Sequence, residues 1–193
     1  MFTPVVLCLL LCAEFVARVV LEIRERRATQ LHGGLFTLFR IVPLLNDLFP
    51  LPENRRSPAE SLFAKKHEEG HAKEHHSVLR NLLKLAFAMV AIWFLATLLV
   101  RYAMPFWQAV LWLHLAAVPF RIFFHFYCWG QEYEADRFAC EKTDKKVARA
   151  ALRELAECEI PYTPLFALVY REHPTAVLRG RRLLNKNVGP RGK

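Results

Sequence analysis

The amino-acid sequence predicts an all-α membrane protein with about three transmembrane helices. Apolar residues make up 54% of the 193 residues and are concentrated in blocks, of which residues 85–100 and 102–120 contain no charged side chain. A helix needs roughly 20 apolar residues to cross the hydrocarbon core of a bilayer. We therefore expect spans at about 3–22, 80–101 and 105–128. A buried helix of a soluble core is the alternative, and it suits residues 4–22 best.

The expected spans contain a few polar side chains. Glu14 and Arg18 are four residues apart in the first span, so they can pair on one helix face and lower the cost of burial. His114 and His125 in the third span are expected to face other helices, and a role as additional metal ligands is the alternative. The first span lacks a preceding basic region and a clear cleavage site, which favours an uncleaved anchor over a signal peptide.

Lys and Arg are distributed unevenly along the chain. They cluster in residues 23–81 and 131–193, whereas the connection between the second and third spans contains only Arg101. The positive-inside rule then predicts an integral, multi-pass protein whose two polar segments, including the C-terminus, face the cytoplasm. The net charge of +9 is thus explained by topology and by attraction to anionic lipid headgroups. No nucleic-acid recognition motif accompanies it, so we expect no nucleic-acid partner.

Two regions are expected along the chain. Residues 1–56 would form an N-terminal membrane anchor and interfacial segment, and residues 57–193 a domain that contains the second and third spans. A break is expected at 32–34. Residues 35–51 contain Pro43 and Pro50 and could lie at the membrane surface or cover the second region; both possibilities stay open. The five cysteines lack a C-x-x-C pattern, so neither a disulfide framework nor a Cys-rich zinc site follows.

Helix signals organise the second region. Ser57, Pro58 and Glu60 form a typical helix start, with Ser57 as the N-cap, and the helix is expected to run unbroken into the second span. The third span is expected to continue to Asp136, with a bend at Gly130. Two more helices are expected at about 144–158 and 175–186.

Residues 67–71 read H-E-x-x-H. Because positions i and i+4 of a helix share a face, His67 and His71 could bind one zinc ion. Glu68 would then lie beside the metal and act as general base. The alternative is a solvated charged stretch. His75 and His76 extend this stretch and are expected to be solvated.

A catalytic zinc site needs a third protein ligand and an open position. Glu132 is the candidate, because the second span leaves the cytoplasmic face and the third returns to it. Asp136 follows one helical turn later and could accept a hydrogen bond from a ligating histidine. An ordinary acidic turn beside the membrane is the alternative reading of both residues.

The order of these motifs resembles a known family. H-E-x-G-H is followed by two spans, by E-x-x-x-D at residues 132–136, and by His173-Pro174-Thr175 with Arg179 six residues after the histidine. This combination is similar to the integral-membrane zinc metalloendopeptidases of the CAAX prenyl protease and HtpX type, over roughly residues 57–186.

The resemblance implies roles for individual residues. It implies one zinc ion per chain with His67, His71 and Glu132 as ligands, and Glu68 as the catalytic base. His173 would lie near the metal and contribute to catalysis. Asp136 and Arg179 would support the ligands as a pair, and His76 matches a recurrent histidine downstream of the motif.

The chain departs from the family pattern at Lys66 and Glu69, where the family has uncharged residues. It also has only one span ahead of the motif, which makes a prenylated substrate doubtful. We expect a membrane-embedded zinc-dependent endopeptidase that faces the cytoplasm and cleaves membrane-associated or misfolded proteins. The alternative is a non-catalytic, zinc-binding scaffold or regulator, favoured by the extra charges at Lys66 and Glu69. The expected partners are the lipid bilayer and a peptide or protein substrate; a second copy or a membrane partner stays open.

Overall fold

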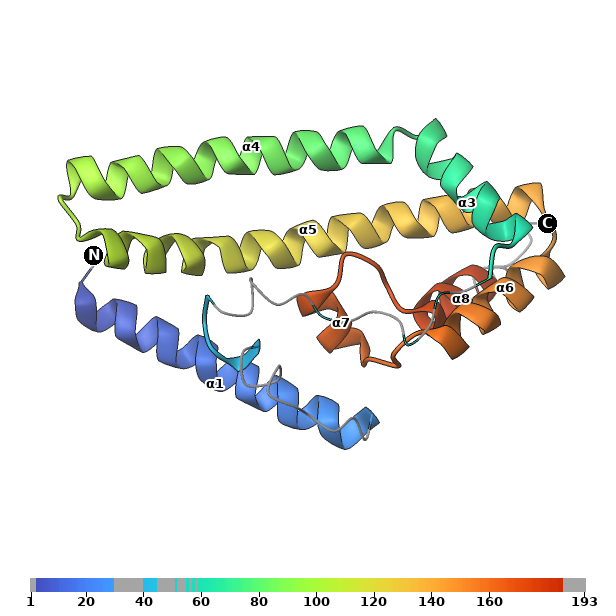
Figure 1. Cartoon of the computed structure of the whole chain (residues 1–193), viewed down its shortest axis with the longest axis horizontal. Coiled ribbons are helices and arrows are strands. Elements are labelled where there is room, and N and C mark those ends of the chain that lie inside the picture. The colour runs from blue at the N-terminus through green and yellow to red at the C-terminus, as the bar shows by residue number, and fades with distance from the viewer. Residues whose placement is uncertain are drawn as a thin grey trace, which may run out of the picture. The chain divides into compact units, whose positions relative to one another are not determined.

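The computed structural model describes residues 3–29, 40–44, 51, 55, 57 and 59–185, and this part of the chain forms helices and no strand (Figure 1). The elements are α1 (Pro4–Thr29), α3 (Leu62–Lys73), α4 (His76–Ala96), the π-helical segment η2 (Thr97–Arg101), α5 (Phe106–Lys142), α6 (Lys145–Cys158), α7 (Pro164–Tyr170) and α8 (Ala176–Asn185). The chain divides into two compact units, one of residues 1–51 and 81–123 and the other of residues 52–80 and 124–193.

Three helices are long and apolar enough to cross a membrane, as predicted: α1, α4 together with η2, and α5. Their apolar side chains point largely outward. On α4, for example, Met89, Ile92 and Trp93 are each at least 65% exposed. A soluble protein rarely exposes such a continuous apolar surface, whereas a bilayer would cover it. The described fold is therefore that of an all-helical membrane protein.

In the first unit, Leu7 of α1 packs in one core with Leu98 of η2 and Trp112 of α5. A polar contact joins α1 to α5 beside this core. The Glu14 carboxylate accepts from Arg18 Nε at 2.8 Å, as the i, i+4 spacing predicted, and it also lies 3.0 Å from His114 Nε2. Three polar side chains in apolar helices thus satisfy one another.

The start of α3 differs from the prediction. The N-cap is Ser61, whose Oγ accepts from the backbone N–H of Ala64 at 3.0 Å, and not Ser57. The backbone N–H of Ala59 instead donates to the Glu154 carboxylate of α6 at 3.1 Å, which holds the preceding segment outside the helix. Pro58, the other part of the predicted start, lies outside the described residues.

The helix that carries the motif does not continue into the second span, so the predicted unbroken helix is wrong. Glu74 ends α3, and His75 adopts a left-handed conformation with φ of 54°. The next helix, α4, begins at His76. Neither proline nor glycine marks this turn, so no local signal predicted it.

The remaining helices follow the prediction closely. α5 passes through both Pro119 and Gly130 as one uninterrupted helix. Asp144 caps α6 by accepting from the backbone N–H groups of Lys146 and Val147. α7 was not predicted. The expected break at 32–34 and most of residues 35–51 lie outside the described residues.

In the second unit, α3 and α5 approach each other closely at Gly70. A Cβ atom on Gly70 would lie 3.2 Å from the Ala135 Cα atom on α5. Two turns before Gly70 on α3, Phe63 packs with Ala148 and Leu152 of α6, against which α8 also packs. The glycine of the motif therefore lets the helix with the two histidines lie directly against the helix with Glu132.

Candidate metal centre

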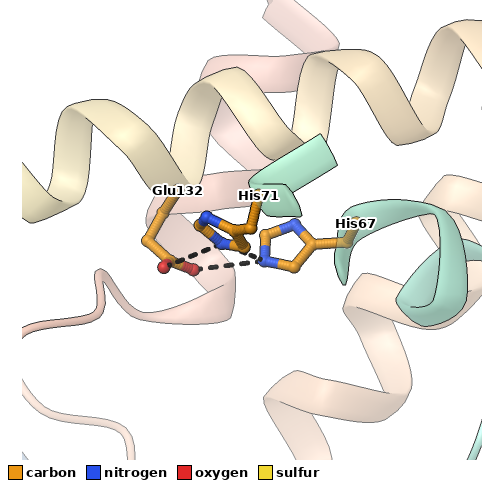
Figure 2. Close-up of side chains that lie close together, drawn as sticks. All are labelled: His67, His71 and Glu132. Carbon is orange, nitrogen blue, oxygen red and sulfur yellow. Dashed lines mark hydrogen bonds and ion pairs between the residues drawn. The ribbon is translucent and has the colours of Figure 1, made fainter. Parts of the chain in front are cut away.

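His67, His71 and Glu132 converge at one point in the second unit (Figure 2). His67 and His71 lie one turn apart on α3, and Glu132 points toward them from α5. The two Nε2 atoms are 3.1 Å apart. Glu132 Oε2 lies 3.3 Å from His67 Nε2, and Oε1 lies 3.2 Å from His71 Nε2. Each of the three predicted ligand residues thus has a nitrogen or carboxylate oxygen within 3.3 Å of each of the other two.

The separations between these ligand atoms fit a zinc ion. Zinc binds imidazole nitrogens and carboxylate oxygens at about 2.0–2.2 Å in tetrahedral geometry, which separates neighbouring ligand atoms by roughly 3.3–3.6 Å. The three observed distances of 3.1, 3.3 and 3.2 Å are close to that range. Two nitrogens and one carboxylate are also a donor set that suits zinc. The residues present therefore fit the metal on both geometry and chemistry.

Burial adds to the case for a cation at this point. Glu132 is 1% exposed and His67 is 7% exposed. A buried carboxylate is costly unless a positive charge or hydrogen-bond donors stabilise it. Burial disfavours the charged form of His67, but hydrogen bonds to Asp136 and Glu132 outweigh this effect and raise its pKa. The carboxylates thus attract positive charge to the site, whether a proton or a metal ion provides it.

Asp136 and Arg179 lie directly behind His67. Asp136 Oδ1 is 3.0 Å from His67 Nδ1, so a proton on Nδ1 would leave the Nε2 lone pair free for a metal. Arg179 of α8 donates to both oxygens of Asp136, at 2.9 and 2.5 Å. Glu159 accepts from the backbone N–H of Ala176 at 2.8 Å and so anchors the first turn of α8. The structure brings together the pair that the sequence indicated.

His173 and Arg80 both contact Glu132. His173 Nδ1 lies 3.1 Å from Glu132 Oε1, and its side chain is 43% exposed. Arg80 Nη2 donates to the same oxygen at 2.9 Å. Sequence reasoning missed Arg80, although its spacing of four residues from His76 on α4 could have placed it on the face that carries that histidine.

The segment that carries His173 is held against α5. Trp129 Nε1 donates to the carbonyl oxygen of Arg171 at 3.2 Å, and His125 Nδ1 lies 2.9 Å from the carbonyl oxygen of Leu168. His125 thus has a hydrogen-bond partner in the second unit, as expected for a polar group of the third span. These contacts fix the connection between α7 and α8 beside Glu132.

His76 is buried, so the expectation that it is solvated is wrong. It is 2% exposed, and its Nδ1 atom lies 2.8 Å from His71 Nδ1. Its Nε2 atom lies 3.3 Å from the Glu134 carboxylate of α5. The preceding residue, His75, is exposed, as expected.

A cavity of about 360 Å³ adjoins the three convergent residues. Glu68 is exposed on its wall, which His173 and Arg80 also line. Phe63 and Leu152 give another part of the wall an apolar surface. The cavity is large enough for a short stretch of peptide, and a peptide bound there would lie next to the Glu68 carboxylate.

Lys66 and Glu69, the two departures from the family pattern, pair with each other. Lys66 Nζ lies 2.5 Å from the Glu69 carboxylate across one turn of α3. Both side chains are partly exposed, so the pair contributes little to stability. The opposite charges nevertheless offset each other, and the pair adds no net charge beside His67.

Comparison with known proteins identifies the family. The model of Peptidase family M48 matches residues 37–187, which is most of the chain. No curated protein and no solved structure matches the chain significantly. The matched region contains every residue of the centre described above. The chain therefore belongs to peptidase family M48, the zinc metallopeptidases of the CAAX and HtpX type whose motif order its sequence resembles.

Proposed function

We propose that the protein is a membrane-embedded, zinc-dependent endopeptidase that hydrolyses membrane-associated or misfolded proteins. The observation that carries the proposal is the convergence of His67, His71 and Glu132 on one point next to the cavity wall that holds Glu68. A structural zinc site would have no use for a free carboxylate at position 68, whereas peptide hydrolysis needs a general base there.

In this proposal His67, His71 and Glu132 hold one zinc ion. Bound zinc would supply Lewis acidity, which lowers the pKa of a water molecule and polarises a peptide carbonyl. Glu68 would accept a proton from the attacking water and deliver it to the nitrogen of the leaving amine. His173, which is partly exposed beside Glu132, would donate a hydrogen bond to the carbonyl oxygen as negative charge develops on it. Asp136 would hold His67 with its proton on Nδ1.

The uneven distribution of Lys and Arg supports a cytoplasmic orientation for the centre and for residues 131–193. The substrate would then be a peptide segment that reaches the cytoplasmic membrane surface. We propose the bilayer as the immediate environment of the exposed apolar surfaces of α1, α4 and α5.

The test is a comparison of zinc content and hydrolysis in the full chain, purified in detergent and reconstituted into vesicles. We expect one zinc per chain in the wild type and in Glu68→Gln, and none in His71→Ala. Hydrolysis of a fluorescently labelled unfolded protein should be lost in both variants. His75→Asn is the matched control, because it removes an exposed histidine from the same stretch and should change neither readout.

The outcomes separate the two functions. Hydrolysis by metal-replete Glu68→Gln would rule out the proposed mechanism. Stoichiometric zinc in a wild type that hydrolyses no peptide would favour the scaffold or regulator. The pairing of Lys66 with Glu69 reduces the support for that alternative, because the two extra charges offset each other.

A further inference from the structure

We propose that His76 is a positioning residue, whose imidazole accepts the hydrogen bond that fixes the ring orientation and tautomer of His71. The inference rests on the proposed function in one respect, since it takes His71 as a metal ligand. It assigns to a buried histidine outside the H-E-x-x-H motif a direct influence on the metal affinity of the centre.

The hydrogen-bond roles follow from the geometry. His71 Nε2 is the atom that converges with His67 and Glu132, so its lone pair must be free for a metal. The proton of a neutral His71 then lies on Nδ1, which is 2.8 Å from His76 Nδ1. His71 therefore donates and His76 accepts. The proton of His76 consequently lies on Nε2, from which it is directed at the Glu134 carboxylate 3.3 Å away.

The two histidines of the motif thus receive support of different kinds. His67 has the Asp136 carboxylate at 3.0 Å from its Nδ1 atom, the common arrangement behind a zinc ligand. His71 has an imidazole in the equivalent place, and the carboxylate of Glu134 lies one step further out. Glu134 is 56% exposed in its side chain. The chain of contacts behind His71 therefore runs from the centre to the protein surface.

The turn before α4 makes this contact possible. In an uninterrupted helix, residues five apart differ by about 140° around the axis, so His71 and His76 would point in different directions. The left-handed conformation of His75, with φ of 54°, ends this regular progression. His76 then becomes the first residue of α4 and is buried against His71. Left-handed backbone is uncommon for a residue with a Cβ atom, and here it serves to return an imidazole to the centre.

Two amide substitutions test the proposal because they place an acceptor at different positions. The side-chain oxygen of asparagine can occupy the place of His76 Nδ1, whereas that of glutamine reaches the place of Nε2. We expect His76→Asn to bind zinc within about threefold of the wild type. His76→Gln should lose about 10- to 100-fold in affinity, the usual loss when such a partner is removed. His75→Asn, in the adjacent exposed position, should match the wild type.

Zinc affinity is measured by chelator competition on the full chain in detergent, without reference to peptide hydrolysis. The absorption spectrum of the Co²⁺-substituted protein gives a second readout, and we expect it to change in His76→Gln and not in His76→Asn. The unfolding temperature of each metal-free variant detects a purely structural effect. Equal affinities for the two amide variants would overturn the proposal, as would a loss of affinity that only parallels a loss of metal-free stability.

The failure of this inference can be distinguished from failure of the proposed function. If the wild type binds no zinc, the metal centre itself is wrong and the positioning role falls with it. If the wild type binds one zinc and both amide variants bind it equally, the centre stands and His76 has no positioning role.

Discussion

Removing the guanidinium of Arg179 should weaken both the fold and the metal centre, and the structure indicates by how much. Arg179 donates to both oxygens of Asp136, whose side chain is almost fully buried and also faces His67 Nδ1 at 3.0 Å. Arg179→Met keeps the apolar volume but leaves the Asp136 carboxylate without its cationic partner. Breaking one side of a buried ion pair costs about 3–5 kcal/mol of stability.

The effect on zinc should be smaller and should act through Asp136. Removal of a group that supports a ligating histidine typically costs about 10- to 100-fold in metal affinity, or about 1.4–2.7 kcal/mol. Asp136→Leu should show this loss directly. In the Asp136→Leu background, Arg179→Met should then cost less than about 0.5 kcal/mol of zinc binding, because the carboxylate through which it acts is gone.

A double-mutant cycle on the full chain measures both quantities. Thermal unfolding of the metal-free protein gives the change in stability, and chelator competition gives the change in zinc affinity. The double variant should be more stable than the sum of the two single changes implies, because no buried charge is left unpaired. Strict additivity in both measurements would refute this reasoning and leave Asp136 as an ordinary buried acid.

Three further predictions concern helix packing, pH and topology. Gly70→Val should lower zinc affinity about tenfold or more, because the added carbons meet the Ala135 backbone at about 3.2 Å and push α3 from α5; an unchanged affinity in chelator competition would contradict this. Burial lowers the pKa of His67, but Asp136 and Glu132 outweigh this effect and raise the pKa above its ordinary value of 6.5. The protonated His67 therefore stabilises the metal-free fold below pH 6.5, and this stabilisation is lost as the pH rises through the raised pKa. Zinc affinity should rise as the pH rises through this range, because zinc competes with the proton on His67. Thermal unfolding of the metal-free protein and chelator competition, each measured across the pH range, check the two trends. Single cysteines at Tyr102 and Glu141 in a cysteine-free background should react with an impermeant reagent from opposite sides of the membrane, and labelling from one side only would contradict the predicted topology.

The sequence predicted the spans and most of the helices because strong local signals mark them. Long uncharged runs marked the three spans, and the helix expected at about 144–158 is α6. The convergence of His67, His71 and Glu132 required one further step, the reasoning that the third span returns to the face from which the second departs. Their spacing and that topology together predicted that the three side chains come together.

The errors arose where tertiary contacts overrode local signals. Ser57 has the better sequence context for a helix start, but the contact between Ala59 and Glu154 moves the start to Ser61. The turn at His75 accompanies the burial of His76 against His71, a tertiary contact that no local propensity reveals. His76 was expected to be solvated because charged residues surround it in the sequence, and only its tertiary contact with His71 shows that it is buried.

The polar contact between Glu14 and His114 has a consequence for biogenesis. Glu14 and Arg18 form a pair within α1, so this helix can enter the bilayer before α5 has been synthesised. Apolar side chains in lipid contribute little specificity to helix association, because the lipid tails are equally apolar. A carboxylate that can accept a further hydrogen bond favours a neighbouring helix that carries a donor. His114 provides that donor once α5 has inserted. The helices are therefore expected to associate in the order of synthesis, and the contact between Glu14 and His114 forms only after the third span has inserted.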